Sequence, residues 1–221
     1  MPTTSHPRPD LRLVSGLPQI GPTILIPHAE AFDDPEWMFE PKYDGVRGLV
    51  YNSPAGCEIR SRQDFLFARF GDLCERLAGI LGSREAILDG EVVALNRQGK
   101  PVLRDLLRGA GYVAFAAFDL LWVDGTDLRP LPLVERKRRL GELLREDTGP
   151  LYKVLTLEED GRALFSAIRK MDLEGIVAKR KNEQYGAATW YKIRNPGYSQ
   201  GEERGDLFRS RERRRTERVV G

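Results

Sequence analysis

The sequence contains few of the residues that most often build metal centres and disulfide frameworks. It has only two cysteines and two histidines in 221 residues, and Cys57 and Cys74 do not form a CxxC pair. His6 and His28 lie far from both cysteines along the chain. This pattern indicates neither a zinc site nor a set of disulfides, and it predicts that both cysteines are structural.

Long hydrophobic runs are also missing. No segment approaches the roughly 18 apolar residues of a membrane helix, and the first ten residues are polar and contain proline, unlike a signal peptide. We therefore expect a cytoplasmic protein without a membrane partner. The hydrophobic content of 41% is still enough to fill the core of one substantial domain.

Three common catalytic and phosphate-binding motifs are absent. We find no GxxxxGK[ST] loop, no GxGxxG between a strand and a helix, and no GxSxG turn. Two histidines also leave little material for a catalytic triad. These absences argue against a P-loop enzyme, a dinucleotide-binding fold and a serine hydrolase.

The net charge of +2 conceals an uneven distribution near the end of the chain. Seven arginines crowd this stretch, namely Arg204, Arg209, Arg211, Arg213, Arg214, Arg215 and Arg218. Such a segment could hold phosphates electrostatically. Five acids are interleaved with them, however, and they favour the alternative of a solvated, partly disordered end.

Short apolar segments predict an α+β order of elements. Alternating or apolar runs predict strands at 37–40, 48–51, 57–62, 86–95, 112–123, 175–179 and 189–194. Apolar residues at helical spacing predict helices over 67–81, 133–144 and 160–171. Strands, one helix, strands, two helices and strands do not form strict βαβ alternation. We predict a proline-rich lead-in over 1–35, one domain over 36–195 and an arginine-rich tail over 196–221.

Six charged residues lie within or at the ends of these predicted strands. They are Lys42, Asp44, Glu91, Glu174, Lys179 and Lys192. Any single one could belong to a structural ion pair, which is the usual explanation. Six are harder to explain in that way, because each isolated buried charge would cost several kcal/mol. A site that contains a metal ion and a triphosphate would gather them around shared counter-ions.

The segment 40–47, with the sequence EPKYDGVR, places a lysine among two acids, a glycine turn and an arginine. A lysine is protonated at neutral pH and has no lone pair with which to attack, so a nucleophilic lysine needs burial or a nearby cation. Taken alone, the segment predicts equally well a surface strand-turn-strand in which Asp44 and Gly45 make the turn.

The remaining motifs decide between these interpretations, because together they resemble those of the covalent nucleotidyltransferases. This superfamily contains the ATP-dependent DNA ligases, the RNA ligases and the mRNA capping enzymes. The similar segments, in the family's order, are Lys42–Arg47 (motif I, KxDGxR), Ser61–Arg62 (Ia), Asp89–Glu91 (III), Phe118–Leu121 (IIIa), Glu174–Lys179 (IV) and Trp190–Arg194 (V). KYDGVR, FDLLW, EGIVAKR and WYKIR resemble bacterial ATP-dependent DNA ligases more than capping enzymes, and 195–200 resembles short bacterial ligase-like proteins.

The resemblance implies a nucleotidyltransferase domain with two mainly antiparallel sheets flanked by helices. It implies that Lys42 attacks the α-phosphorus of ATP, releases pyrophosphate and forms a lysyl-AMP phosphoramidate. The AMP would then pass to the 5′-phosphate of nicked or broken DNA during strand joining in repair or recombination.

The resemblance also implies roles for the residues that match its motifs. Lys179 and Lys192 would stabilise charge on the α-phosphate, and Glu174 with Asp44 would hold Mg²⁺ or Mn²⁺. The nucleoside contacts implied are Glu91 and Arg62 at the ribose, Arg47 at the ribose or a phosphate, Phe118 stacked on adenine, and Glu40 or its backbone at the 6-amino group.

Other residues within the motifs receive a structural interpretation. Asp119 and Trp190 are assigned to the core, and out of context Phe118 would be a core residue too. Arg47 and Arg62 would otherwise form surface ion pairs. Arg194 stands where the family often has a second lysine, and a planar guanidinium is not equivalent to a point-like ammonium, so Arg194 is left out of the predicted site.

The sequence departs from the family after motif V. The ligases that it resembles have an OB-fold there, which closes over ATP and DNA, whereas only residues 195–221 follow here. Those 27 residues are too few for a five-stranded barrel. We therefore expect the OB-fold to be absent and a partner protein to be a possible source of a clamp. A non-catalytic module that binds nucleotides or DNA ends, and an RNA ligase or capping enzyme, remain alternatives.

Overall fold

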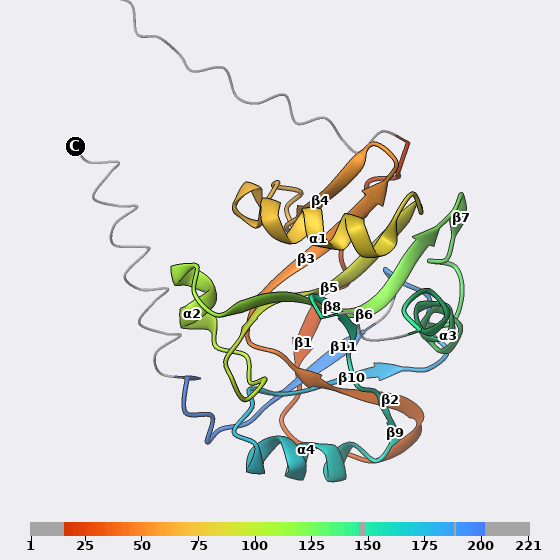
Figure 1. Ribbon diagram of the computed structural model, residues 1–221. Coiled ribbons are helices and arrows are strands. Elements are labelled where there is room, and N and C mark those ends of the chain that lie inside the picture. Colours follow the sequence, from red (N-terminus) through yellow and green to blue (C-terminus); the bar gives the residue numbers. More distant parts are fainter. Residues whose placement is uncertain (1–15, 146–148, 188, 202–221) are drawn as a thin grey trace, which may run out of the picture.

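The computed structural model describes residues 16–145, 149–187 and 189–201. Two sheets pack face to face, and helices cover the outer face of each (Figure 1). Within these described ranges, no helix has the length and apolar character needed to cross a membrane. The predicted α+β class with two mainly antiparallel sheets is confirmed. The arginine-rich segment from residue 202 onward lies outside the described ranges.

The first sheet contains five strands. In spatial order they are β1 (Leu25–Pro27), β11 (Trp190–Arg194), β10 (Gly175–Arg180), β2 (Asp34–Lys42) and β9 (Leu157–Glu159). Only β1 and β11 pair in parallel, while the other neighbours are antiparallel. The motifs that contain Lys42, Lys179 and Lys192 therefore lie on three adjacent strands.

The second sheet is antiparallel apart from one short strand. Its order is β4 (Gly56–Arg60), β3 (Val46–Ser53), β5 (Ala86–Leu95), β6 (Tyr112–Val123) and β7 (Thr126–Asp127), with β8 (Leu151–Lys153) pairing in parallel to β6. The predicted strands 86–95 and 112–123 are confirmed with the same bounds as β5 and β6. Both are long apolar runs, which is typical of central strands.

Within the described ranges, four α-helices flank the sheets. They are α1 (Gly71–Leu81, after a 3₁₀ turn at Ala68–Phe70), α2 (Leu103–Arg108), α3 (Leu133–Leu143) and α4 (Gly161–Lys170). The predictions for α1, α3 and α4 are confirmed within about two residues, apart from the start of the first, where Ala68–Phe70 forms a 3₁₀ turn. Residues of α1, α2 and α3 pack on the outer face of the second sheet, and α4 packs on the first. Cys74 belongs to the first of these cores, and both cysteines are free.

Side-chain alternation explains how polar residues reach the space between the sheets. On β10, Ile176 and Ala178 pack outward beneath α4, while Val177 and Lys179 face the second sheet. On β2, Phe39 packs outward and Glu40 faces inward. Each strand thus supplies an apolar face to a core and a mixed face to the inter-sheet space.

Five short elements were not predicted from the sequence. Helix α2 and strands β7, β8 and β9 span only two to six residues, which is too short for periodicity to identify them. Strand β1 lies in the segment predicted as a lead-in, and nearby Leu17 and Ile20 are buried between the sheets. The described part of that segment is therefore integral to the fold.

A buried ion pair connects α3 to the central strand β6. The Nε and Nη2 atoms of Arg136 each donate to an Asp119 oxygen at 2.9 Å, and both side chains are fully buried. Nη1 also donates to the carbonyl oxygens of Leu131 and Glu183, at 2.6 and 3.0 Å. Burial raises the pKa of Asp119, and Arg136 opposes that rise. The assignment of Asp119 to structure is confirmed.

We predict that Arg136→Met destabilises the domain by about 3–5 kcal/mol, because it leaves the Asp119 carboxylate buried without its counter-ion. Urea unfolding followed by tryptophan fluorescence measures this change. A double variant with Asp119→Leu should recover part of the loss. Arg138→Met, which removes two exposed ion pairs on the same helix, is the control and should change stability little. Equal effects of the two arginine variants would contradict the prediction.

Candidate active site

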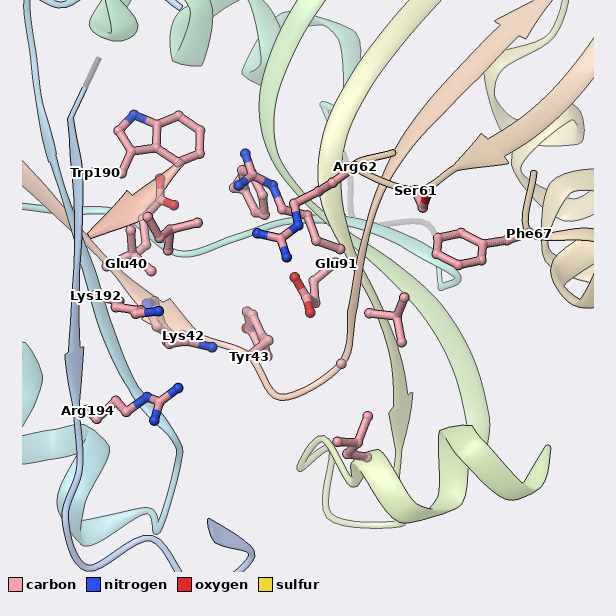
Figure 2. A pocket seen from close by; sticks show the side chains of 18 of the residues that line it. Glu40, Lys42, Tyr43, Ser61, Arg62, Phe67, Glu91, Trp190, Lys192 and Arg194 are labelled. Atoms are coloured by element: carbon pink, nitrogen blue, oxygen red, sulfur yellow. The ribbon is translucent and has the colours of Figure 1, made fainter. Parts of the chain in front are cut away.

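A cavity of about 750 Å³ opens between the two sheets, and both sheets supply its lining (Figure 2). It brings together every residue predicted for catalysis or nucleotide binding, namely Glu40, Lys42, Arg47, Arg62, Glu91, Phe118, Lys179 and Lys192. The two predicted metal ligands, Asp44 and Glu174, are not among the lining residues.

Lys42 ends β2 and is held by Glu174. Its Nζ lies 2.6 Å from Glu174 Oε2, and the Glu174 residue is only 5% exposed. The two meet because Gly175, the first residue of β10, is directly opposite Lys42 in the strand register. A Cβ on Gly175 would lie 2.1 Å from the carbonyl oxygen of Ile193 on β11, and the φ angle of Gly175 is +151°. Glycine alone therefore permits β10 to approach β11 this closely.

The connection from Lys42 to β3 passes from one sheet to the other. A Cβ on Gly45 would lie 2.3 Å from the Val92 carbonyl oxygen, so the glycine of the KxDG motif is required for close packing on β5. Asp44, in the same connection, is 1% exposed and accepts a hydrogen bond from the Tyr198 hydroxyl at 3.1 Å. Asp44 does not line the cavity, and its role as a second metal ligand stays a prediction.

One end of the cavity is cationic. Trp190, Lys192 and Arg194 alternate along β11 toward the cavity, with Lys192 near Lys42 (Figure 2). Burial, together with the neighbouring charges of Arg194 and Lys42, lowers the pKa of Lys192. Arg194 was left out of the predicted site, yet the structure places it in the lining. The sequence did contain a signal for this position: Arg194 is two residues from Lys192 on one strand, and alternate residues of a strand face the same side.

The other end combines aromatic rings with a buried carboxylate. Glu40 is 2% exposed and pairs with Lys179 at 2.6 Å and with Lys137 from α3. Burial by itself would raise the pKa of Glu40, but the two lysines outweigh it and hold the pKa below its usual value. Burial also lowers the pKa of Lys179 to about 8.

Lys179 lies beside aromatic rings, and its contact with the α-phosphate stays a prediction. Its Nζ lies 4.2 Å from the ring centroid of Phe118 and 4.0 Å from that of Trp190. Lys179 is therefore at the aromatic end and not beside Lys42. Trp190 packs in the inter-sheet core, as predicted, and it also lines the cavity.

Lys137, which pairs with Glu40 at the aromatic end of the cavity, was not indicated by the sequence. It belongs to a helix with several exposed basic residues, where a lysine is ordinarily solvated. Only the packing of α3 against β6 brings its ammonium to Glu40.

Arg47 is anchored within the protein. Its Nε and Nη2 atoms donate to the two oxygens of Asp89 at 3.0 and 2.7 Å, and Nη1 donates to the Thr23 carbonyl oxygen at 2.6 Å. Tyr185 adds a hydrogen bond to Asp89 at 2.7 Å. Burial opposes the charge on Arg47, but Asp89 outweighs it and raises the pKa of the guanidinium. Arg47 thus ties the lead-in segment to β3 and β5 while it borders the cavity.

The family resemblance implies a divalent cation, and Glu174 is a carboxylate beside Lys42 that could bind it. Among the described residues there is no group of three or more histidine, cysteine or carboxylate side chains arranged to hold a metal. Mg²⁺ is commonly bound by one or two carboxylates together with substrate phosphates and water. Glu174 fits such a site, whereas buried Asp44 is directed to Tyr198.

Comparisons with known proteins agree with this geometry. The family model described as ATP dependent DNA ligase domain matches residues 26–194. The multifunctional non-homologous end joining protein LigD of Pseudomonas aeruginosa is 34% identical over 169 residues, which cover 72% of this chain and 20% of that protein. The SPbeta prophage-derived DNA ligase-like protein LigB of Bacillus subtilis is 25% identical over 192 residues, covering 82% of this chain and 69% of that protein.

Solved structures show the same fold. The ligase domain of LigD from M. tuberculosis has a TM-score of 0.70 and 31% identity, with 79% of this chain and 59% of that chain covered. A mycobacterial DNA ligase D complexed with ATP and MES has a TM-score of 0.71 and 30% identity, with 79% and 60% covered. The chain spans about a fifth of the length of the LigD proteins that it matches. The family match and these structural similarities show that the chain belongs to the family of ATP-dependent DNA ligase domains.

Proposed function

We propose that Lys42 takes AMP from ATP and that the AMP then passes to a DNA 5′-phosphate. The observation that carries this proposal is the position of Lys42. It lies at the cationic end of a cavity of about 750 Å³ whose other end is aromatic, which matches the order of phosphates and base in ATP. The family membership of the chain supports the same chemistry.

In the first step, the Lys42 nitrogen forms a bond to the α-phosphorus while the bond from that phosphorus to the β-phosphate oxygen breaks. Pyrophosphate leaves with the electron pair of that bond. Lys42 must lose a proton, and the Glu174 carboxylate, 2.6 Å away, is an acceptor within reach. Lys192 and Arg194 would offset phosphate charge. A Mg²⁺ or Mn²⁺ ion held by Glu174 and the phosphates would add positive charge when bound.

At the other end of the cavity, we propose that Phe118 stacks on adenine and that Glu40 accepts a hydrogen bond from the 6-amino group. Lys137 and Lys179 keep Glu40 ionised, which makes it an acceptor and not a donor. Lys179 would therefore act on base recognition through Glu40. The proposed ribose contacts remain Glu91, on β5, and Arg62, in the loop after β4.

The acceptor is proposed to be a DNA nick or break in repair, because the similar LigD proteins are named for non-homologous end joining. Recombination, a partner that supplies a clamp, and a role in the cytoplasm belong to the same proposal. RNA joining and nucleotide binding without transfer are the competing outcomes of the experiments below.

Incubation with α-labelled ATP and Mg²⁺ should leave label on the chain, and Lys42→Ala should reduce it to background. Lys42→Arg should also abolish label, because a guanidinium keeps the charge but stays protonated. Lys170→Ala, at an exposed position of α4, is the control and should label normally. Label that persists in Lys42→Ala would contradict the assignment of Lys42 as the residue that accepts AMP. ATP binding without label in the unaltered protein would select the non-catalytic alternative.

Glu40→Gln should weaken the preference for ATP over the analogue that lacks the 6-amino group by about 10-fold to 100-fold. A hydrogen bond to a charged group contributes roughly 1.5–3 kcal/mol, and the variant loses that charge. The rate of lysyl-AMP formation at several nucleotide concentrations measures the preference. Glu36→Gln, which is exposed on the same strand, is the matched control. An unchanged preference in Glu40→Gln would show that another group reads the base.

Protein that already carries labelled AMP should transfer it to the 5′-phosphate of a nicked DNA duplex faster than to a duplex whose 5′-phosphate strand is RNA. Transfer is followed by the appearance of label on the nucleic acid. Faster transfer to RNA would favour the RNA ligase alternative, and efficient labelling of the protein by GTP would favour a capping activity.

A further inference from the structure

Phe65 presents an exposed aromatic ring at the cavity. Phenylalanine is ordinarily buried, but Phe65 is 68% exposed and belongs to the cavity lining. Other large apolar side chains of the described residues are also exposed, among them Leu155 at 65% and Met171 at 62%. Neither of these lines the cavity. Phe65 therefore differs from ordinary scattered surface residues in its position.

The loop that carries Phe65 is held in a defined shape. The Ser61 backbone N–H donates to the Phe65 carbonyl at 2.8 Å, and the Phe65 N–H donates to Ser61 Oγ at 3.1 Å. Asp64 has a left-handed φ of +61° and pairs with Arg60 at 3.0 Å. Arg60 is itself buried and paired with Glu58 at 3.0 Å. These contacts hold the backbone in the conformation that exposes the ring.

Basic residues flank the ring. Arg62 and Arg69 are exposed, and both line the same cavity as Phe65. The guanidinium carbon of Arg69 lies 4.5 Å from the Phe70 ring centroid, so this side chain is also supported by packing. An aromatic ring that lines the same cavity as two exposed arginines matches nucleic acid, because bases stack on rings and arginines pair with phosphates.

We propose that Phe65 stacks on the nucleobase at the strand end that receives AMP, and that Arg69 contacts the adjoining backbone phosphate. This inference rests on the proposed transfer of AMP to DNA. It assigns a contact for the nucleic acid at the rim of the nucleotide cavity, beside the proposed ribose contact of Arg62. The loop 61–67 thereby places the acceptor strand next to the lysyl-AMP phosphoramidate on Lys42.

The test uses the full chain and a nicked duplex with 2-aminopurine at the 5′-phosphate end. Phe65→Ala should self-adenylate within about twofold of the unaltered protein. It should bind the duplex about tenfold more weakly, lose most of the quenching of 2-aminopurine and transfer AMP more slowly at low DNA concentration. Phe65→Trp should retain quenching and transfer, because tryptophan also stacks. Leu155→Ala and Met171→Ala are the matched controls and should behave as the unaltered protein.

Two failures can be told apart. If the unaltered protein does not take label from ATP, the proposed function fails, and duplex binding with 2-aminopurine quenching still tests Phe65. If the protein takes label but Phe65→Ala quenches, binds and transfers AMP as the unaltered protein does, only the stacking contact is overturned. Normal transfer by Phe65→Ala but loss of transfer by Phe65→Trp would also overturn it, since a larger ring would then act as an obstruction.

Discussion

The space between the two sheets contains several buried charges, and three of them, Lys42, Glu40 and Arg47, each lie beside a counter-charge. Lys42 is held by Glu174, Glu40 lies between two lysines, and Arg47 makes a two-pronged contact with Asp89. Removing such charges from water costs several kcal/mol each unless the pairing is close. The polar cavity can therefore exist inside this fold only while these partners stay in register. The fully buried pair of Asp119 and Arg136 applies the same constraint to the helix that carries Lys137.

Two glycines determine whether this register is possible. Gly175 lets β10 approach β11 closely enough for Glu174 to meet Lys42, and Gly45 lets the connection after Lys42 pack on β5. A Cβ at either position would overlap a carbonyl oxygen at about 2 Å. The conformational freedom of glycine matters less at Gly45 than its lack of a side chain. Tyr198 supports the same connection from the far side through Asp44.

The two ends of the cavity differ in character, and its lysines are divided between them. Lys42 and Lys192 lie at the cationic end, where Arg194 adds charge, whereas Lys179 is paired with Glu40 against two aromatic rings. The low pKa of Lys179, about 8, follows from burial that its carboxylate partner only partly offsets. Lys42 on β2 and Lys179 on the adjacent strand β10 can thus serve different parts of one bound nucleotide.

Much of this protein follows from the sequence alone. Periodicity predicted β5, β6 and the three longer helices, because long amphipathic or apolar segments depend mainly on local pattern. Strand-borne charges predicted four residues of the cavity, Lys42, Glu91, Lys179 and Lys192, because isolated buried charges are unfavourable, whereas Asp44 and Glu174 from the same set do not line it. The tertiary structure alone decided the pairing of Lys137 with Glu40, the turning of Asp44 toward Tyr198 and the place of Lys179. Those outcomes depend on contacts between residues more than 90 positions apart or on the direction of a single turn, and neither leaves a periodic signal in the chain.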